Sequence, residues 1–218
     1  MFLCACSGPH NYIGEQYLNK PYISNPLGEG KLPDMDPLIR FDGFDCTTFV
    51  ETSLAGGNLK KLNKIRYKNG KIDVLCRNHF TETDWLKNNE FENISNRYGG
   101  VSVRHVVIDK KSWFKKVYNI DTDFEKQPVD IEYIPYENLS KINIQSPIIV
   151  LFIHDGDGFI DKIGTDLAVV HMGFLLPGNI LRHASRQYGR VMDVDFESYI
   201  NKRKQNKHNL GISLVKIK

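Results

Sequence analysis

The apolar positions of the chain predict helices in its first half and strands in its last third. From residue 46 to 54, apolar and small residues recur at i, i+3, i+4, i+7 and i+8, as in one stripe of an amphipathic helix. Asp45 is suited to cap this helix at its N-terminus, and Gly56-Gly57 to end it. The stripe consists of Cys46, Phe49, Val50, Ser53 and Leu54.

Further along, the pattern changes from helical to extended. The run PIIVLFIH at 147–154 is almost continuously apolar, as in a strand buried on both faces. Residues 167–176 and 180–185 predict a hairpin around Pro177-Gly178-Asn179. We also expect strands at 101–108 and 212–217, short helices at 11–18, 83–88 and 113–119, a helix or turn at 58–66, a turn at Asn69-Gly70, a surface loop at 21–37 and a helix at 195–202. Helices followed by an antiparallel sheet indicate an α+β fold.

The amino-acid composition further restricts the class of protein. The chain has 218 residues, of which 41% are hydrophobic and 25% charged, so we expect one globular domain over residues 11–218. The formal charge of +3 is modest, and the run KRKQNK at 202–207 predicts a solvated face, not a nucleic-acid site. No apolar segment approaches the roughly 20 residues that cross a bilayer.

The first ten residues, MFLCACSGPH, are similar to the end of a bacterial lipoprotein signal, in which small residues precede a lipidated cysteine. A basic start and an apolar stretch of about 7–15 residues would complete such a signal, and neither is present here. We therefore expect either a remnant of a signal or linker over residues 1–10, with Cys6 as the site of a lipid anchor, or a chance similarity.

Cys46 is the first candidate for chemistry. At a helix N-terminus, free backbone N–H groups and the helix dipole favour a thiolate over a thiol, which can make a cysteine nucleophilic. Cys46 could equally be a small core residue, since free cysteine is often buried. A Cys46–Cys76 disulfide is a further alternative. The four cysteines have no metal-site spacing.

A cysteine nucleophile needs an imidazole and a group that orients it. If Pro177-Gly178-Asn179 is a three-residue loop, Leu176 pairs with Ile180, and His171 and His183 point to the same face as diagonal neighbours. A two-residue loop would place the two histidines on opposite faces. Each histidine alone is more simply a structural residue; together with a cysteine at a helix start, they favour catalysis.

Four motifs resemble the NlpC-type papain-like cysteine peptidases, and in particular a branch similar to N-acetylmuramoyl-L-alanine amidases. They are DCTTFVE, RYKNGKID, RNHFTETDW and HMGF followed by RHAS, and they span roughly residues 12–196. The resemblance implies a papain-like, barrel-like fold, with the nucleophile helix packed on an antiparallel sheet. It implies Cys46 as nucleophile, His171 as base, His183 as the third residue and Tyr22 near the reaction centre.

The resemblance also implies a substrate and a location. We expect hydrolysis of the amide between N-acetylmuramic acid and L-alanine in peptidoglycan, without a cofactor or metal, by a monomer in the periplasm or cell envelope. Thr47 replaces the serine usual in the peptidase members and favours the amidase branch. A stem-peptide endopeptidase, a non-catalytic cell-wall binding module and a lipid acyltransferase are the alternatives. The residues expected to contact substrate are Asp45, Thr47, Arg77, Asn78, His79, Trp85 and Ser185.

Overall fold

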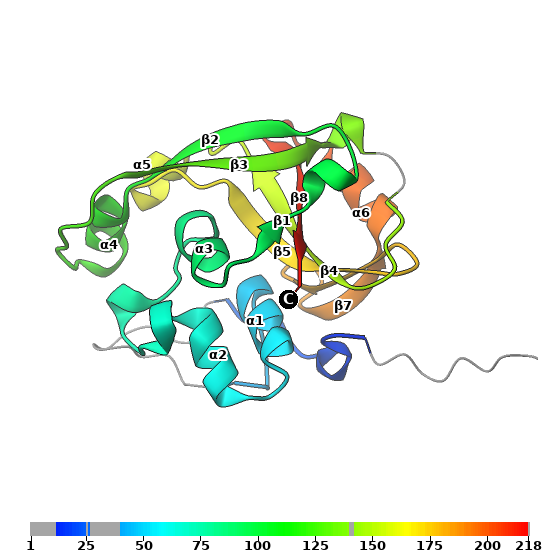
Figure 1. Ribbon diagram of the computed structural model, residues 1–218, viewed down its shortest axis with the longest axis horizontal. Coiled ribbons are helices and arrows are strands. Elements are labelled where there is room, and N and C mark those ends of the chain that lie inside the picture. Colours follow the sequence, from blue (N-terminus) through cyan, green and yellow to red (C-terminus); the bar gives the residue numbers. More distant parts are fainter. Residues whose placement is uncertain (1–11, 25, 27–39, 140–141, 218) are drawn as a thin grey trace, which may run out of the picture.

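Backbone hydrogen bonding joins eight strands into one antiparallel sheet in the computed structural model, which describes residues 12–24, 26, 40–139 and 142–217. The strand order is β2-β3-β8-β4-β5-β6-β7, with the short β1 also paired to β8 (Figure 1). The strands are β1 Glu92–Asn93, β2 Ser102–Ile108, β3 Gln127–Pro135, β4 Ile148–His154, β5 Val169–Leu176, β6 Ile180–Ser185, β7 Arg190–Asp195 and β8 Asn209–Lys216.

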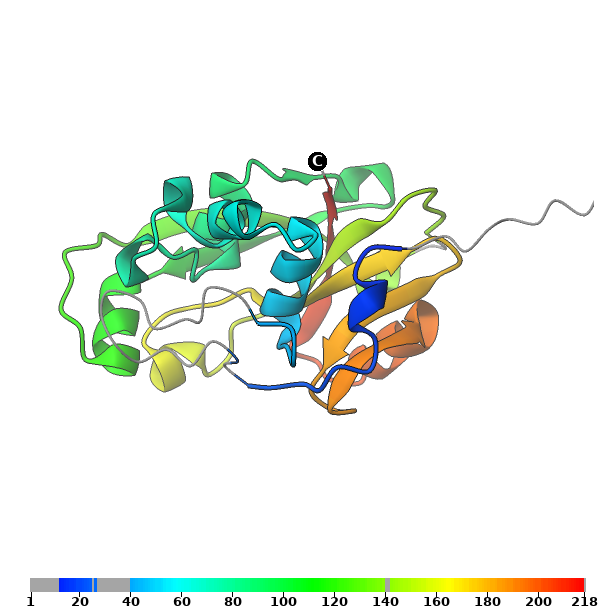
Figure 2. The same cartoon turned by 90° about the horizontal axis from the view of Figure 1, so that it is seen from below.

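The sheet is open, which corrects the barrel-like expectation, because β2 and β7 form its two edges. The β7 edge is covered by the segment before the first α-helix instead of by another strand. The backbone N–H of Asn19 donates to Val191, that of Val191 to Lys20, and that of Tyr22 to Gly189, each at 2.8 Å. Figure 2 shows this N-terminal segment running beside the orange strands. The edge therefore satisfies its hydrogen bonds without closure of the sheet.

The central strand β4 divides the core into two layers. Its residues are buried from Ile148 to Ile153, as the continuous apolar run predicts. Because successive side chains of a strand point to opposite faces, Ile149 and Leu151 pack in the core cluster of α1, whereas Val150 and Phe152 pack in the cluster of α6. Helices thus cover both faces of the sheet, with α1 and α6 on opposite sides.

The bounds of the first α-helix follow from the residues at its two ends. The helices are α1 Cys46–Ala55, α2 Leu59–Arg66, α3 Leu86–Asn88, α4 Lys110–Tyr118, α5 Phe159–Ile163 and α6 Phe196–Arg203. Asp45 caps α1 through a reciprocal pair of bonds with Thr48, and Gly56 ends it with a left-handed φ of 59°. The expected cap and stop of α1 are therefore both confirmed. In the part of the chain that the structure describes, no helix is long and apolar enough to cross a membrane.

For the remaining elements, the predicted type of secondary structure agrees with the structure more often than the predicted first and last residues do. The hairpin has the predicted three-residue loop, with Leu176 paired to Ile180 and Phe174 to Arg182. Residues 81–85 form a π-helical turn before α3, and 15–17 a short 3-10 helix. Strands β1, β3 and β7 and helix α5 were not predicted. Most of the loop expected at 21–37 lies outside the described residues, as do Cys4 and Cys6.

Candidate active site

The thiol of Cys46 is held at the first residue of α1. The Asp45 carboxylate accepts hydrogen bonds from the Thr48 backbone N–H and hydroxyl, each at 2.8 Å, which fixes the entry of the chain into the helix. From this position the sulfur accepts a hydrogen bond from the backbone N–H of Met172 in β5. Cys46 is a free thiol, and so is Cys76, so the two form no disulfide. The nucleophile candidate therefore touches the strand that carries His171.

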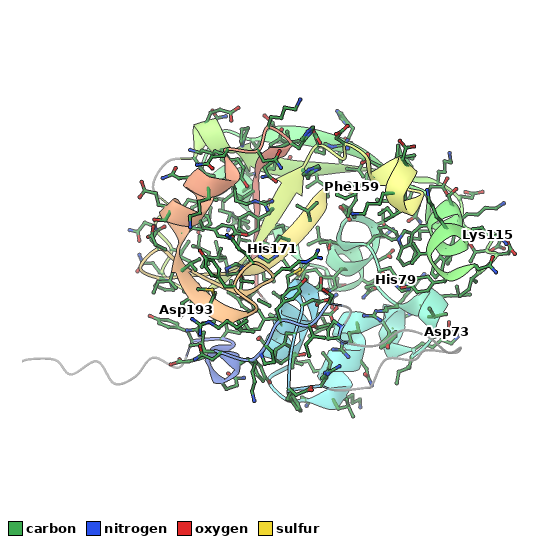
Figure 3. All side chains as sticks on the ribbon, turned by 180° about the vertical axis from the view of Figure 1, so that it is seen from behind. Asp73, His79, Lys115, Phe159, His171 and Asp193 are labelled. Carbon is green, nitrogen blue, oxygen red and sulfur yellow. The ribbon has the colours of Figure 1, made fainter. Side chains whose placement is uncertain are left out.

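The two histidines form a hydrogen-bonded pair. Nε2 of His171 lies 2.8 Å from Nδ1 of His183, and the ring centroids are 5.0 Å apart. Both rings also face Tyr199 of α6. The same-face geometry predicted from the three-residue loop is therefore present. Figure 3 shows His171 in the middle of the molecule.

Gly173 in β5 allows β5 and β6 to approach each other closely. A Cβ atom at this position would lie 2.9 Å from the Cβ of His183 and 2.8 Å from the backbone oxygen of Arg182. Real Cβ contacts are essentially never this short, so a larger residue would push β6 away from β5. The glycine two residues after His171 is thus explained by the close packing of the histidine pair.

Cys46 and the histidine pair line the same cavity, next to the point where the pairing of β5 with β6 ends. The β5–β6 register runs from Leu176–Ile180 to Phe174–Arg182 and ends there within the described strands. His171 and Met172 lie just beyond that point. Cys46 belongs to the face of the sheet that α1 covers, whereas the rings of His171 and His183 face Tyr199 of α6. The pairing of β5 with β6 therefore ends next to the residues that line one cavity with Cys46, whereas β5 remains paired to β4 and β6 to β7.

Tyr22 reaches the same place from the segment that covers β7. It forms an isolated bridge with Phe44, just before α1, in addition to its bond to Gly189. Burial, and then the proximity of Cys46 and Asp45, raises the pKa of Tyr22 above its ordinary value. At neutral pH its hydroxyl is therefore protonated and able to donate a hydrogen bond.

These groups share one cavity of about 480 Å³. Five residues predicted to act in catalysis or binding line it: Tyr22, Cys46, His171, His183 and Ser185. The Ser185 hydroxyl accepts a hydrogen bond from the Tyr188 backbone N–H at 3.3 Å. The opposite wall comes from α6 and the turn after β6, through Arg186, Tyr188, Ser198, Tyr199, Lys202 and Arg203. A volume of this size is within the range of small-molecule binding sites.

Burial determines the charge of the site. It raises the pKa of the Cys46 thiol to about 12, with a further contribution from Asp45, although the backbone of Met172 and the side chain and backbone of Thr47 lower it. Burial also lowers the pKa of His171 well below its usual value and that of His183 to about 4. The resting site is therefore a neutral thiol beside neutral imidazoles. Burial thus opposes the thiolate that the helix start was expected to favour.

Four of the residues expected to contact substrate do not line this cavity. Trp85 is 1% exposed and packs on Phe91 in the core, with ring centroids 4.6 Å apart. The Asn78 amide is buried and donates to the Ile65 carbonyl. His79 bonds to the Val74 carbonyl among aromatic rings, and its label lies apart from that of His171 in Figure 3. Arg77 bridges to Tyr67 and does not line the cavity. A role in substrate binding stays a prediction for all four.

Asp45 and Thr47 lie next to the nucleophile without lining the cavity. The Asp45 carboxylate is occupied by Thr48, and Oγ1 of Thr47 lies 4.0 Å from the Cys46 sulfur. A contact of either residue with substrate stays a prediction. Among the residues that the structure describes, no group of three or more His, Cys, Asp or Glu side chains is arranged to hold a metal ion.

The α6 wall was missed by sequence reasoning. The basic run at 202–207 is largely exposed, as expected, but Lys202 and Arg203 also line the cavity. A signal was present: Asp195, Ser198, Tyr199, Lys202 and Arg203 follow the spacing i, i+3, i+4, i+7 and i+8, which places them on one helix face.

The fold and the site together describe an α+β protein with a cysteine and a histidine pair in one cavity. The model of the N-acetylmuramoyl-L-alanine amidase-like family matches residues 12–211. The chain therefore belongs to this family. No curated protein matches the sequence.

Solved structures share the architecture. A protein from Legionella pneumophila is 27% identical, with a TM-score of 0.83 over 93% of this chain and 86% of that one. An N-acetylmuramoyl-L-alanine amidase from Bacteroides uniformis is 23% identical, with a TM-score of 0.72 over 94% and 97% of the two chains. A Bacteroides fragilis protein named as a candidate xylanase is 24% identical, with a TM-score of 0.73 over 93% and 98%. At these identities, the similarity to the two Bacteroides proteins shows a shared fold and nothing about function.

Proposed function

We propose that this protein is a cysteine amidase of the NlpC-type, papain-like superfamily, which hydrolyses the amide between N-acetylmuramic acid and L-alanine in peptidoglycan fragments. The observation that carries the proposal is the convergence of Cys46 with the His171–His183 pair on one cavity. Membership of the amidase-like family supports the bond and the substrate class. A location in the cell envelope, with a lipid anchor at Cys6, belongs to the same proposal.

The first half of the reaction forms a thioester. With Nε2 of His171 bonded to His183, Nδ1 is the ring nitrogen left for the thiol. Because the thiol pKa is about 12, the proton leaves Cys46 as the sulfur attacks the amide carbonyl, and His171 takes it as general base. His171 then gives this proton to the nitrogen of L-alanine, and the peptide departs as an amine.

The second half reverses these roles. Water loses a proton to His171 and attacks the thioester carbonyl, and the proton then returns to the sulfur. The products are the free carboxylic acid of muramic acid and the intact stem peptide, so one water is consumed per bond cleaved. The backbone N–H of Cys46 and the protonated hydroxyl of Tyr22 are the donors available to the oxyanion in both steps.

Mass spectrometry of defined muropeptides tests the proposal. Wild type is expected to release the intact stem peptide, Cys46→Ala to release nothing, and Cys76→Ala, which alters the other free cysteine of the described chain, to behave as wild type. Release of L-alanyl-D-glutamate from sugar-free peptides would convert the proposal to a stem-peptide endopeptidase. Cleavage of neither bond by wild type would leave only a common fold.

A further inference from the structure

One face of α6 forms a wall of the cavity, opposite Tyr22 and Cys46. Lys202 and Arg203 bring two positive charges to this wall, and Arg186 adds a third from the turn after β6. The one carboxylate in the lining, Asp195, is already engaged, because it caps α6 by accepting from the Ser198 backbone N–H at 2.8 Å and the Asn179 side-chain amide at 3.4 Å. The cavity therefore has an excess of positive charge over available negative charge.

Arg203 is the cation of this wall that is partly buried. Its Nε and Nη2 atoms are shielded from solvent and the guanidinium interacts with the side chain of Tyr136, so an entering anion meets the part of the group that lines the cavity. Its guanidinium carbon lies 5.4 Å from the centre of the Phe152 ring, a cation–π contact that positions the group without neutralising it. A shielded cation that lacks a carboxylate partner is costly, and an anion entering the cavity would remove that cost.

The position of Arg203 links this charge to the reacting groups. Its positive charge acts on both His171 and His183, so the guanidinium lies within electrostatic reach of the proposed base. Lys202 is exposed at the mouth of the cavity, where its Nζ lies 3.3 Å from the Tyr188 hydroxyl. One cation is thus partly buried against Phe152, and the other is exposed at the rim.

We propose that Arg203 and Lys202 form a carboxylate-binding subsite, which selects peptides with a free carboxylate close to the amide that is cleaved. The subsite rests on the proposed amidase function. In the stem peptide of peptidoglycan, D-glutamate follows L-alanine, and its α-carboxylate is the free carboxylate nearest to the amide that is cleaved. A guanidinium can hold both oxygens of a carboxylate, whereas the neutral carboxamide of an amidated stem offers one acceptor and no charge. The enzyme therefore distinguishes acidic from amidated peptidoglycan.

Binding to Cys46→Ala tests the subsite without requiring catalysis. Two muropeptides that differ only in a free or amidated D-glutamate α-carboxyl are titrated by calorimetry. A second pair, which differs only at the C-terminal carboxyl, distinguishes the two sources of the anion. We expect the free acid to bind about tenfold more tightly or better, as a charge-assisted hydrogen bond supports. Adding Arg203→Gln should bring the affinity ratio of the responsive pair close to one, and Arg203→Lys should keep part of it.

Two further variants keep the test independent of folding. Lys202→Gln alters an exposed side chain and should reduce the same ratio in part, whereas Lys204→Gln removes a charge from the end of the same helix, beside a different cavity, and should leave it unchanged. Equal affinity for the free and amidated members of both pairs, or a ratio retained in both Arg203→Gln and Lys202→Gln, would overturn the subsite. If wild type cuts no muropeptide, the amidase proposal fails, but the affinity ratio still decides whether the subsite binds carboxylates.

Discussion

Nε2 of His171 lies 2.8 Å from Nδ1 of His183, and the low pKa values of both rings mean that a single proton occupies this contact at neutral pH. If Nδ1 of His171 is to accept the thiol proton, Nε2 must carry a proton and donate it to His183. His183 then holds its own proton on Nε2. The pair therefore selects the tautomer of His171 as well as the orientation of its ring.

The first prediction concerns this tautomer. We expect His183→Ala to lower kcat by roughly 10- to 100-fold, since the base remains but its orientation and tautomer are no longer fixed. His183→Gln, which offers an amide oxygen as acceptor, should lose less. Steady-state hydrolysis of a defined muropeptide measures the effect, with thermal unfolding as a control for the loss of a buried side chain. Activity equal to wild type in His183→Ala would contradict the role.

The second prediction concerns the resting charge of Cys46. A thiol pKa of about 12 lies far above neutral pH, so the thiolate fraction should rise about tenfold for each pH unit between 7 and 10. The rate of alkylation by iodoacetamide should rise in the same proportion without a plateau. The measurement uses a variant in which Cys4, Cys6 and Cys76 are alanine, so that one cysteine reacts. A plateau below pH 8 would instead indicate a preformed thiolate–imidazolium pair.

The local parts of the site were predictable because each depends on a short stretch of sequence. Asp45 and Gly56-Gly57 delimit α1 through backbone chemistry, and a three-residue loop sets the register that brings His171 and His183 to one face. These predictions needed no information about distant contacts.

The parts that were missed depend on tertiary contacts. Strand β7 has an edge position with a partly exposed pattern, and its partner on the open side is the N-terminal segment, which no local pattern identifies. Trp85 was expected at a substrate wall, but its ring fills the core beside Phe91. The raised thiol pKa follows from burial, which depends on distant parts of the chain and opposes the effect expected from a helix start.

A third prediction tests the hydroxyl of Tyr22. Because its pKa is raised, it remains a donor throughout the neutral range, and Tyr22→Phe removes that donor while keeping the ring. We expect kcat to fall roughly 10- to 100-fold with a smaller change in KM, since an oxyanion donor acts mainly in the transition state. Tyr98→Phe, which alters a partly buried tyrosine in the other core layer, is the control. A change confined to KM would assign Tyr22 to substrate binding instead.

The last prediction concerns the charge pair that anchors α1 to α2. Nε of Arg66 donates to a Glu51 carboxylate oxygen at 3.1 Å, and the two residues are 1% and 3% exposed. Burial raises the pKa of Glu51, while Arg66 opposes that shift. Arg66→Met should therefore lower the free energy of unfolding by about 3–5 kcal/mol, because it leaves a buried carboxylate without its nearby cation.

Urea denaturation of single and double variants separates the pair from its surroundings. In Arg66→Met the pKa of Glu51 rises further, so the folded state binds a proton more readily than the unfolded state, and the loss of stability should shrink as the pH is lowered from 7 to 5. Glu51→Met with Arg66→Met should recover most of the loss, because no unpaired charge remains. Arg97→Met, which breaks an exposed pair with Glu92, should cost less than about 1 kcal/mol. A double variant less stable than Arg66→Met would mean that the pair itself, and not the orphaned charge, determines the stability of this junction.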